Sequence, residues 1–214
     1  MGIVGVIAGT PVDTRMGVDF LTKKGLVAKG RSSSSTPEEQ TKMQTLSPLE
    51  LTQQVIGLSF ELINEGADKI LLYCNSLSGA IDLSKLRKTV AVPVITPLDV
   101  YADLAQKYQK LAVLAANCQS LAAIERTFQQ ANPNCLVFGA GILPVVIAIE
   151  NEVPSRLLVN RYGLKQLVEG FVKMGAEALV LGCTHFPYLA GELARICPVE
   201  LIEPSEKMAE MLIG

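Results

Sequence analysis

Residues 66–76 read Gly-Ala-Asp-Lys-Ile-Leu-Leu-Tyr-Cys-Asn-Ser, and residues 175–185 repeat the pattern as Gly-Ala-Glu-Ala-Leu-Val-Leu-Gly-Cys-Thr-His. Each copy is an apolar run that ends in a cysteine, Cys74 or Cys183, followed by a small polar residue. Such a run is typical of a buried parallel strand that carries a thiol to its carboxyl end. Two such units facing each other would place one thiol on either side of a single cleft.

The repeat extends beyond the cysteines. Residues 4–10 align with residues 111–117, and both segments are short apolar runs that open into small and polar residues. Pro97 aligns with Pro204 at the same spacing. Three matched segments in one order indicate two homologous α/β halves.

Apolar, strand-like runs alternate with amphipathic stretches along the chain, the pattern of a parallel α/β sheet. We expect strands at residues 3–7, 69–73, 92–95, 111–115, 136–139, 178–181 and 199–202. Thr36 and Ser47 each precede a proline and stand three residues before a glutamate, which predicts two capped helix starts. The serine-rich segment 31–35 is interpreted as a solvated mobile loop.

The repeat also predicts the domain boundaries. The first copy of the pattern ends near Pro97, and the final helix is expected to pack back on the first half. We therefore expect a first domain at residues 1–96 plus 200–214, which carries Cys74. Residues 97–199 are expected to form the second domain, which carries Cys183.

Composition excludes several classes of protein. The 214 residues are 49% hydrophobic with a net charge of −2 and scattered Lys and Arg, which argues against nucleic-acid binding. The longest apolar stretch, residues 136–149, is too short to span a bilayer, so it is interpreted as a strand, a turn and the start of another element. No basic leader precedes the first strand, and the five cysteines show no disulfide-like spacing. Both observations favour the cytoplasm.

The two repeated cysteines are the candidate catalytic thiols. A thiol just before a helix lies at the positive end of the peptide dipole, which lowers its pKa and makes thiolate available. The residues that follow, Asn75, Ser76 and Thr184, can hold a carboxylate with their side chains and backbone N–H groups. The remaining cysteines have no such counterpart and are interpreted as packing residues: Cys118, Cys135 and Cys197.

His185 is the only histidine and lies two residues past Cys183. Its imidazole could take or share the thiol proton, because its ordinary pKa lies near neutrality. One histidine without a C-x-x-C spacing predicts no metal site. The glycine-rich phosphate-binding motifs and the arginine of a phosphatase loop are also missing, so we expect no cofactor.

Residues 181–189, Leu-Gly-Cys-Thr-His-Phe-Pro-Tyr-Leu, resemble the second cysteine motif of the aspartate/glutamate racemase superfamily, and residues 74–76 resemble its first. The resemblance implies a cofactor-independent racemase or epimerase of an amino acid, with an acidic one such as aspartate or glutamate as the first candidate. It implies two Rossmann-like halves related by pseudo-twofold symmetry, with the active site in the cleft between them. One cysteine would remove the α-proton and the other would protonate the opposite face.

By position in the family, Cys74 would serve the D-enantiomer and Cys183 the L-enantiomer. Family members are commonly dimers, so the resemblance also implies a homodimer. The chain departs from the glutamate racemase pattern at Ala8-Gly9, where those enzymes have Asp-Ser, so a carboxylate that would assist the first thiol is missing. We expect the substrate to be held by five polar residues: Thr10, Asn75, Ser76, Asn117 and Thr184.

Two alternatives stay open. One is another proton-transfer reaction of the superfamily, of the hydantoin racemase, maleate isomerase or malonate decarboxylase type. Retention of both cysteines disfavours the decarboxylase, which needs only one. The other is a catalytically weak amino-acid-binding or regulatory protein on the same fold, which the absence of auxiliary residues at Ala8 and Ala116 favours. Arg15, Lys24 and Arg31 are candidate partners of a side-chain carboxylate, although each is interpreted first as a surface charge.

Overall fold

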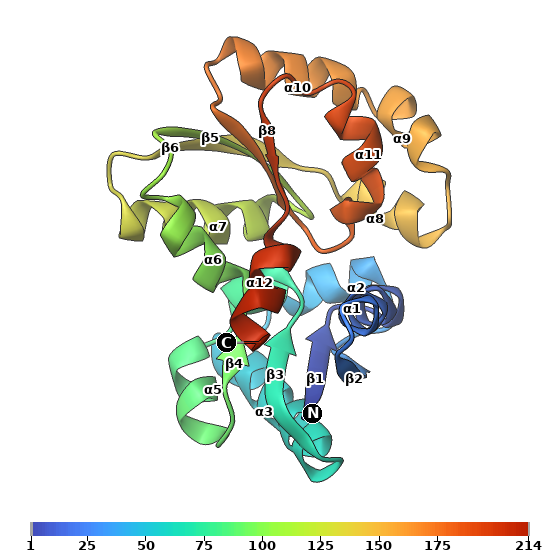
Figure 1. Ribbon diagram of the computed structural model, residues 1–214, viewed down its shortest axis with the longest axis vertical. Coiled ribbons are helices and arrows are strands. Elements are labelled where there is room, and N and C mark those ends of the chain that lie inside the picture. The colour runs from blue at the N-terminus through green and yellow to red at the C-terminus, as the bar shows by residue number, and fades with distance from the viewer. Residues whose placement is uncertain (1, 214) are drawn as a thin grey trace. The chain divides into compact units, whose positions relative to one another are not determined.

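The computed structural model describes residues 2–213, and these fall into two compact units of similar construction. One unit comprises the chain up to Asp99 together with the segment from Ser205 onward, and the other runs from Val100 to Pro204. Each unit contains one four-stranded parallel sheet with helices on both faces (Figure 1). The expected α/β fold of two parallel-sheet halves is confirmed.

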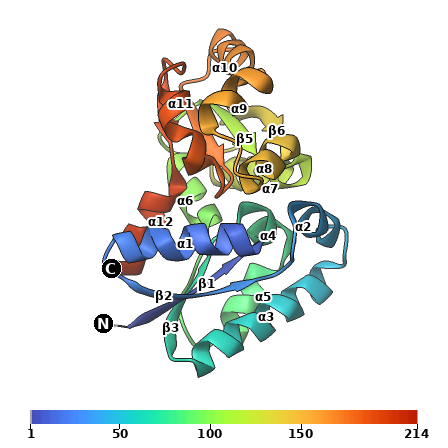
Figure 2. The ribbon, with the colours of Figure 1, turned by 90° about the vertical axis from the view of Figure 1, so that its right-hand side faces the viewer.

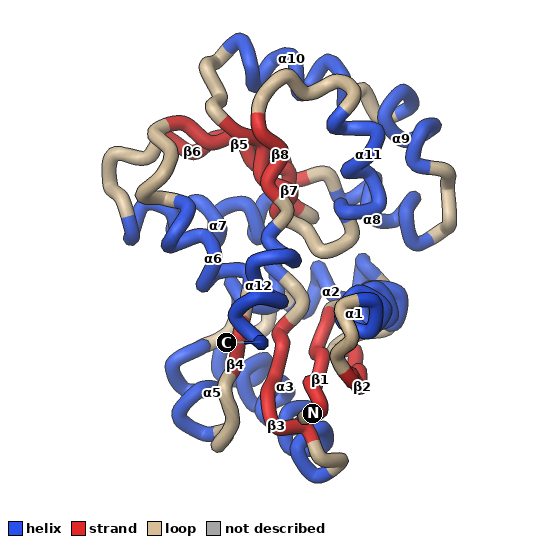
Figure 3. The backbone as a smooth tube through the Cα atoms, viewed as in Figure 1, coloured by secondary structure: helices blue, strands red, loops and turns tan. Residues whose placement is uncertain are grey.

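The first unit alternates strands and helices joined by short loops (Figure 3). Its elements, in chain order, are β1 (Ile3–Ala8), α1 (Pro11–Lys23), β2 (Val27–Ser32), α2 (Pro37–Met43), α3 (Pro48–Asn64), β3 (Ala67–Leu72), α4 (Asn75–Ala80), α5 (Leu83–Thr89) and β4 (Val94–Ile95). The final helix α12 (Pro204–Ile213) clusters with this unit from Ser205 onward. Tyr73 and Ser205 are hydrogen-bonded within the unit through their hydroxyl groups, 3.2 Å apart.

Helices cover both faces of the first sheet, α1 on one side and α3 with α5 on the other (Figure 2). Ile7, Ile70 and Leu72 pack with α3 residues such as Leu51 and Val55 in one buried cluster. On the opposite face, a Cβ added to Gly17 of α1 would lie 2.8 Å from the Tyr73 ring, so glycine allows the helix to approach the sheet closely. The predicted start of α3 is confirmed, because Ser47 and Glu50 form a reciprocal capping box.

The second unit repeats the plan with more helices on one face. Its elements are α6 (Pro97–Leu104), which contains the boundary at Asp99, then β5 (Lys110–Ala115), α7 (Cys118–Ala131), β6 (Leu136–Gly141), α8 (Leu143–Glu150), α9 (Ser155–Arg161), α10 (Leu164–Lys173), β7 (Ala178–Gly182), the 3-10 helix η1 (Phe186–Leu189), α11 (Ala190–Ala194) and β8 (Glu200–Ile202). In the ribbon, α7 and α10 lie on opposite sides of the sheet (Figure 1).

The two sheets have the same strand order. The first is β2-β1-β3-β4 and the second is β6-β5-β7-β8. In the first sheet, β2 lies on one side of β1 and the next strand, β3, lies on the other side. In the second sheet, β6 and β7 lie on opposite sides of β5 in the same way. The direction of strand addition therefore reverses between β1 and β3 and between β5 and β7. Ligands of open α/β sheets bind outside the carboxyl ends of the strands at such a switch point. The residues that follow these four strands are therefore the place to look for chemistry.

β2 and the segment that follows it differ from the expectations drawn from the sequence. β2 is an edge strand of sequence Val-Ala-Lys-Gly-Arg-Ser, with one exposed and five half-buried residues, so it lacks the apolar run that marks a buried strand. The prediction of a solvated loop at residues 31–35 is wrong: Ser32 ends β2, and Ser33 and Ser34 are buried. Their backbone N–H groups donate to the carbonyls of Ala8 and Gly9 at 3.0 and 2.9 Å. This segment is therefore attached to the end of β1.

Two further expectations concern the domain boundary near residue 200 and the apolar stretch at residues 136–149. Residues 200–202 were expected in the first domain, but β8 pairs with β7 in the second sheet, so the chain divides at Pro204. The apolar stretch 136–149 forms β6, a short turn and α8, as predicted. Within the described residues, no helix has the length and apolar character needed to cross a membrane.

Candidate active site

Cys74 lies at the start of α4, and only Tyr73 separates it from the end of β3. Its backbone is extended, with φ −163° and ψ 117°, and it forms the N-cap position of the helix. Ser78 donates to the Cys74 carbonyl from its backbone N–H at 3.0 Å and from its hydroxyl at 2.6 Å. The thiol is buried, and Asn75 and Ser76 are buried with it. The predicted delivery of this thiol from a strand end to a helix start is confirmed.

Polar side chains contact the Cys74 thiol. Gln40, from the middle of α2, has its Nε2 atom 3.4 Å from Cys74 Sγ and 2.6 Å from Ser76 Oγ. Ser76 Oγ itself lies 3.4 Å from Cys74 Sγ. All three residues are buried, so these contacts are shielded from water. We call Gln40, Cys74 and Ser76 the Cys74 cluster.

A carboxylate lies at the end of β1, although the sequence analysis found none there. Asp13 is in the first turn of α1 and is almost completely buried. Its Oδ2 accepts the Gly9 N–H at 3.3 Å, and its own N–H donates to Thr10 Oγ1 at 3.2 Å. Asp13 lies four positions beyond Gly9, so the dipeptide Ala8-Gly9 gives no sign of this carboxylate. Thr10, expected to bind substrate, is buried and acts as the N-cap of α1.

Cys183 occupies the corresponding position in the second unit, directly after β7. No α-helix begins there, so that part of the expectation is wrong. Residues 183–185 form a turn that leads into the 3-10 helix η1, and the Phe186 N–H donates to the Cys183 carbonyl at 3.0 Å. The argument from the helix dipole therefore applies to Cys74 and has little basis at Cys183.

The Cys183 thiol instead has a histidine beside it. Cys183 Sγ and His185 Nδ1 are 3.6 Å apart, and His185 Nε2 is 2.8 Å from Glu150 Oε1. The side chains of His185 and Glu150 are only 6% and 11% exposed. The carboxylate favours a hydrogen on Nε2, which leaves Nδ1 of the neutral ring as an acceptor directed at the thiol. We call Cys183, His185 and Glu150 the Cys183 cluster.

Glu150 was not identified from the sequence. It is the last residue of α8 and directly follows the apolar run that the sequence analysis had noted. A charged residue at the end of a buried apolar helix was the available signal. Gln40 carries no comparable signal, because it is an ordinary polar residue in a short helix.

The other predicted binding residues lie beside the thiols or at the matching helix cap. Thr184 is buried and follows Cys183 directly. Asn117 follows β5 and caps α7, with Oδ1 accepting the Ser120 N–H at 2.9 Å. That bond uses the acceptor atom of the amide, so a carboxylate would have to bind the Nδ2 donor. Gly141 lies close to the backbone of Asn117, because a Cβ at Gly141 would lie 2.3 Å from the Asn117 carbonyl carbon. Only glycine allows this approach.

Tyr101 adds a buried hydroxyl to the surroundings of Cys183. Burial raises the pKa of Tyr101 far above its ordinary value, and the charge on Cys183 raises it further. The phenol ring packs on Phe128 with 5.1 Å between ring centroids. Tyr101 is therefore a neutral neighbour of this thiol throughout the ordinary pH range.

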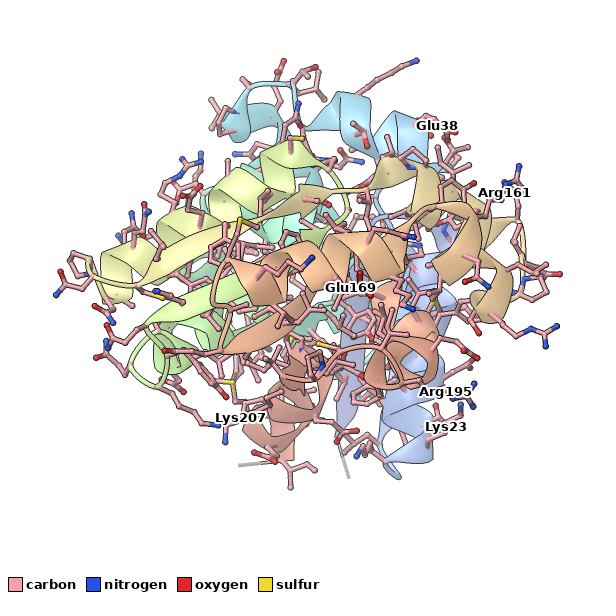
Figure 4. All side chains as sticks on the ribbon, turned by 90° about the horizontal axis from the view of Figure 1, so that it is seen from above. Lys23, Glu38, Arg161, Glu169, Arg195 and Lys207 are labelled. Atoms are coloured by element: carbon pink, nitrogen blue, oxygen red, sulfur yellow. The ribbon has the colours of Figure 1, made fainter. Side chains whose placement is uncertain are left out.

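Of the three charged residues considered as substrate partners, Arg15 is exposed on α1 and the other two form ion pairs at the surface. Arg31 pairs with Glu61 and Glu65, and Lys24 pairs with Glu206. The charged side chains marked in Figure 4 extend outward from separate parts of the chain: Lys23, Glu38, Arg161, Glu169, Arg195 and Lys207. From residue 2 to residue 213, no group of three or more His, Cys, Asp or Glu side chains is arranged to hold a metal ion.

Comparison with known proteins finds one family. Residues 60–212 match the family model described as Asp/Glu/Hydantoin racemase. The glutamate racemase of Desulforudis audaxviator is 27% identical over 161 residues, which cover 72% of this chain and 56% of that protein. The glutamate racemase of Deinococcus radiodurans is 30% identical over 141 residues, covering 62% and 47%. The chain thus spans about half the length of the curated relatives it matches.

Solved structures share the fold at lower identity. The glutamate racemase of Francisella tularensis, determined in complex with D-glutamate, has a TM-score of 0.77 and 21% identity, covering 99% of this chain and 80% of that one. A structure described as a putative Asp/Glu racemase from Yersinia pestis has a TM-score of 0.70 and 16% identity, with both chains covered completely. The arrangement of two parallel-sheet units is therefore common to these proteins.

Proposed function

Because the chain belongs to the Asp/Glu/Hydantoin racemase family, we propose that it interconverts the enantiomers of an amino acid without a cofactor, with Cys74 and Cys183 as the two bases. The observation that carries the proposal is the equivalence of the two thiols. Each follows the strand next to the central strand of its sheet, at the point where the strand order reverses. Each is buried and has a polar side chain beside it: Gln40, 34 positions away, at Cys74, and His185, two positions away, at Cys183.

The chemistry needs one thiolate and one thiol at a time. The thiolate takes the proton from the α-carbon and becomes a thiol, while the other thiol gives its proton to the opposite face and becomes a thiolate. The charge balances, and each turnover leaves the two sulfurs in exchanged protonation states. The substrate determines the direction: Cys74 acts on the D-enantiomer and Cys183 on the L-enantiomer.

The Cys183 cluster supports a role for His185 in managing the thiol proton. Nδ1 can accept the proton of Cys183, which converts the sulfur to a thiolate and the ring to an imidazolium. Glu150 then stabilises the positive ring through its contact with Nε2. A carboxylate oriented on an imidazole in this way plays the same part in serine hydrolases.

The substrate carboxylate is the natural partner for the hydrogen-bond donors near the thiols. We assign this role to Asn75, Thr184 and Asn117, to Ser76 through its backbone N–H, and to Thr10 at the N-cap of α1. These donors stabilise the negative charge that moves onto the carboxylate when the α-proton leaves. The names of the curated relatives and the D-glutamate in the Francisella tularensis enzyme favour an acidic amino acid as the substrate.

Solvent deuterium tests the proposal directly. The dialysed protein is incubated in D2O, without pyridoxal phosphate or metal, with each enantiomer of glutamate, aspartate and a 5-substituted hydantoin. We expect one compound to gain deuterium at the reacting carbon and to racemise, with both processes unaffected by a chelator. Activity that appears only after pyridoxal phosphate or a metal is added would contradict the two-thiol mechanism. Binding of an amino acid without any exchange would favour the regulatory alternative.

A further inference from the structure

The two thiols are contacted by different chemical groups. His185, backed by a carboxylate, is the neighbour of Cys183, whereas the Cys74 cluster contains an amide and a hydroxyl. An imidazole exchanges protons near neutral pH, but a glutamine amide does not titrate. Gln40 can therefore favour the Cys74 thiolate only by donating hydrogen bonds, because its amide cannot accept the thiol proton.

We propose that Gln40 is a positioning residue that holds Cys74 in its thiolate form by donating hydrogen bonds. The Nε2 amide carries two N–H donors, and it lies 2.6 Å from Ser76 Oγ and 3.4 Å from Cys74 Sγ. Ser76 accepts one N–H, which leaves its own O–H to donate to the sulfur 3.4 Å away. The thiolate thus receives one hydrogen bond from Gln40 and one from Ser76. The stabilisation of the Cys74 thiolate by Gln40 does not depend on the proposed function, whereas its importance for catalysis does.

The local fold directs Gln40 to this position. Ser33 and Ser34 fix the segment after β2 to the carbonyls of Ala8 and Gly9, and Ser34 Oγ donates to Gly9 at 2.6 Å. Thr36 then caps α2, and Gln40 lies in the middle of this helix on its buried side. This explains why a serine-rich segment is buried at the edge of the sheet.

Gly9 provides the space through which the Gln40 side chain reaches the thiol. A Cβ on Gly9 would lie 3.0 Å from Gln40 Cγ and 3.1 Å from Cδ. The charged group that the described contacts bring to this part of the unit is Asp13, whose carboxylate accepts the Gly9 N–H. Gly9 therefore contacts both Asp13, through its N–H, and the Gln40 side chain.

The test measures thiolate formation at each cysteine without any substrate. Iodoacetamide labelling is followed from pH 5 to pH 10, and mass spectrometry of the peptides gives a midpoint pH for Cys74 and for Cys183 in the same sample. Limited access of the reagent scales a whole profile without moving its midpoint. We expect Gln40→Met to raise the Cys74 midpoint by about one pH unit, equivalent to about 1.4 kcal/mol, and to leave the Cys183 midpoint unchanged.

Two further variants make the result specific. Gln40→Glu replaces the donor with an acceptor and a negative charge, so it should raise the Cys74 midpoint more than Gln40→Met does. Gln44→Met is the matched control, because Gln44 is the C-cap of the same helix, bonds the Gln40 carbonyl and has no contact with the thiol. It should leave both midpoints in place.

Several outcomes would overturn the proposal. An unchanged Cys74 midpoint in Gln40→Met, or a wild-type midpoint in Gln40→Glu, would show that Gln40 does not donate to the thiolate. Equal shifts at Cys74 and Cys183, or a shift in Gln44→Met, would show a general effect on the fold. Because labelling needs no substrate, the assignment of Gln40 can hold even if racemisation is not observed, and the two proposals fail independently.

Discussion

His185 Nε2 lies 2.8 Å from Glu150 Oε1, and both side chains are almost completely buried. The other ring nitrogen of His185 is 3.6 Å from the Cys183 sulfur, so one imidazole connects a carboxylate to a thiol. A buried carboxylate needs a partner for its charge, and a protonated histidine provides it. In the proposed mechanism, Glu150 stabilises the imidazolium that forms when His185 accepts the Cys183 proton.

The first prediction concerns the charge on Glu150. Glu150→Gln keeps a hydrogen-bonding group next to His185 but removes the charge that stabilises the imidazolium. We expect α-proton exchange of the L-enantiomer to slow by about a hundredfold, the lower end of the usual contribution of general acid–base catalysis. Solvent deuterium incorporation, measured separately from each pure enantiomer, gives the rate.

Glu152→Gln is the control for this experiment, because Glu152 is exposed and lies two residues further along the chain. It should leave exchange of both enantiomers at the wild-type rate. Equal slowing of both enantiomers in Glu150→Gln would argue that Glu150 maintains the fold instead of assisting Cys183.

The second prediction is a dependence of stability on pH in the second unit. Tyr108 donates its hydroxyl to Glu200 at 2.6 Å, and this bond, with Lys107 beside it, lowers the pKa of Glu200 below its ordinary value of 4.5. A lowered carboxyl pKa contributes stability above 4.5, and this contribution is lost as the pH falls through the lowered value. Glu200 is half-exposed, so the effect should be less than about 1 kcal/mol.

Thermal denaturation of wild type and Tyr108→Phe at a series of pH values measures this contribution. The variant should melt at a lower temperature at pH 7, and the gap should narrow between pH 5 and pH 3. A gap that stays constant over this range would assign the loss to packing of the hydroxyl and not to the Glu200 charge.

The third prediction uses two glycines of the second unit. A Cβ at Gly141 would lie 2.3 Å from the Asn117 backbone, whereas no atom lies within 4 Å of a Cβ at Gly170 in the middle of α10. Gly141→Ala should destabilise the protein by about 2 kcal/mol or more, because backbone must move to admit the methyl group. Gly170→Ala should stabilise it by about 0.5–1 kcal/mol through helix propensity. Urea denaturation measures the free energy of unfolding of both variants. Similar changes in this free energy for Gly141→Ala and Gly170→Ala would contradict the steric argument.

Much of the fold could be predicted because its buried strands are apolar runs of ordinary length. β1, β3, β5 and β7 stand out, and the repeat pairs β1 with β5 and β3 with β7. β2 was missed for a physical reason: it is an edge strand with polar, partly exposed residues, and its place is fixed by pairing with β1. Tertiary contacts of this kind leave no local trace in the sequence.

The candidate site divides in the same way. Cys74, Cys183 and His185 could be found because the repeat and their close spacing are visible along the chain. Their partners come from far away: Gln40 is 34 positions from Cys74, and Glu150 is 35 positions from His185. Only the folded chain brings such residues together. Glu150 at least ends an apolar helix, whereas Gln40 has no feature that distinguishes it from a surface glutamine.

The last prediction divides the five cysteines. Removal of a proton by one thiolate and its replacement by the other thiol requires both Cys74 and Cys183, so alanine at either should abolish interconversion in both directions. A single remaining base can still remove a proton and return one from solvent. Cys74→Ala should therefore keep residual exchange of the L-enantiomer alone, and Cys183→Ala that of the D-enantiomer. Polarimetry follows interconversion, and mass spectrometry in D2O follows exchange.

The other three cysteines provide the controls for this division. Cys118 is exposed, Cys197 is half-buried, and burial raises the pKa of Cys135, which disfavours its thiolate. Alanine at any of them should leave the rates of interconversion and exchange close to wild type, and Cys135→Ala should act through lost packing, seen as a lower melting temperature. The two-base assignment requires a clear contrast between these variants and those at Cys74 and Cys183. Near wild-type interconversion by Cys74→Ala or Cys183→Ala would refute it, since one thiol cannot serve both faces of the α-carbon.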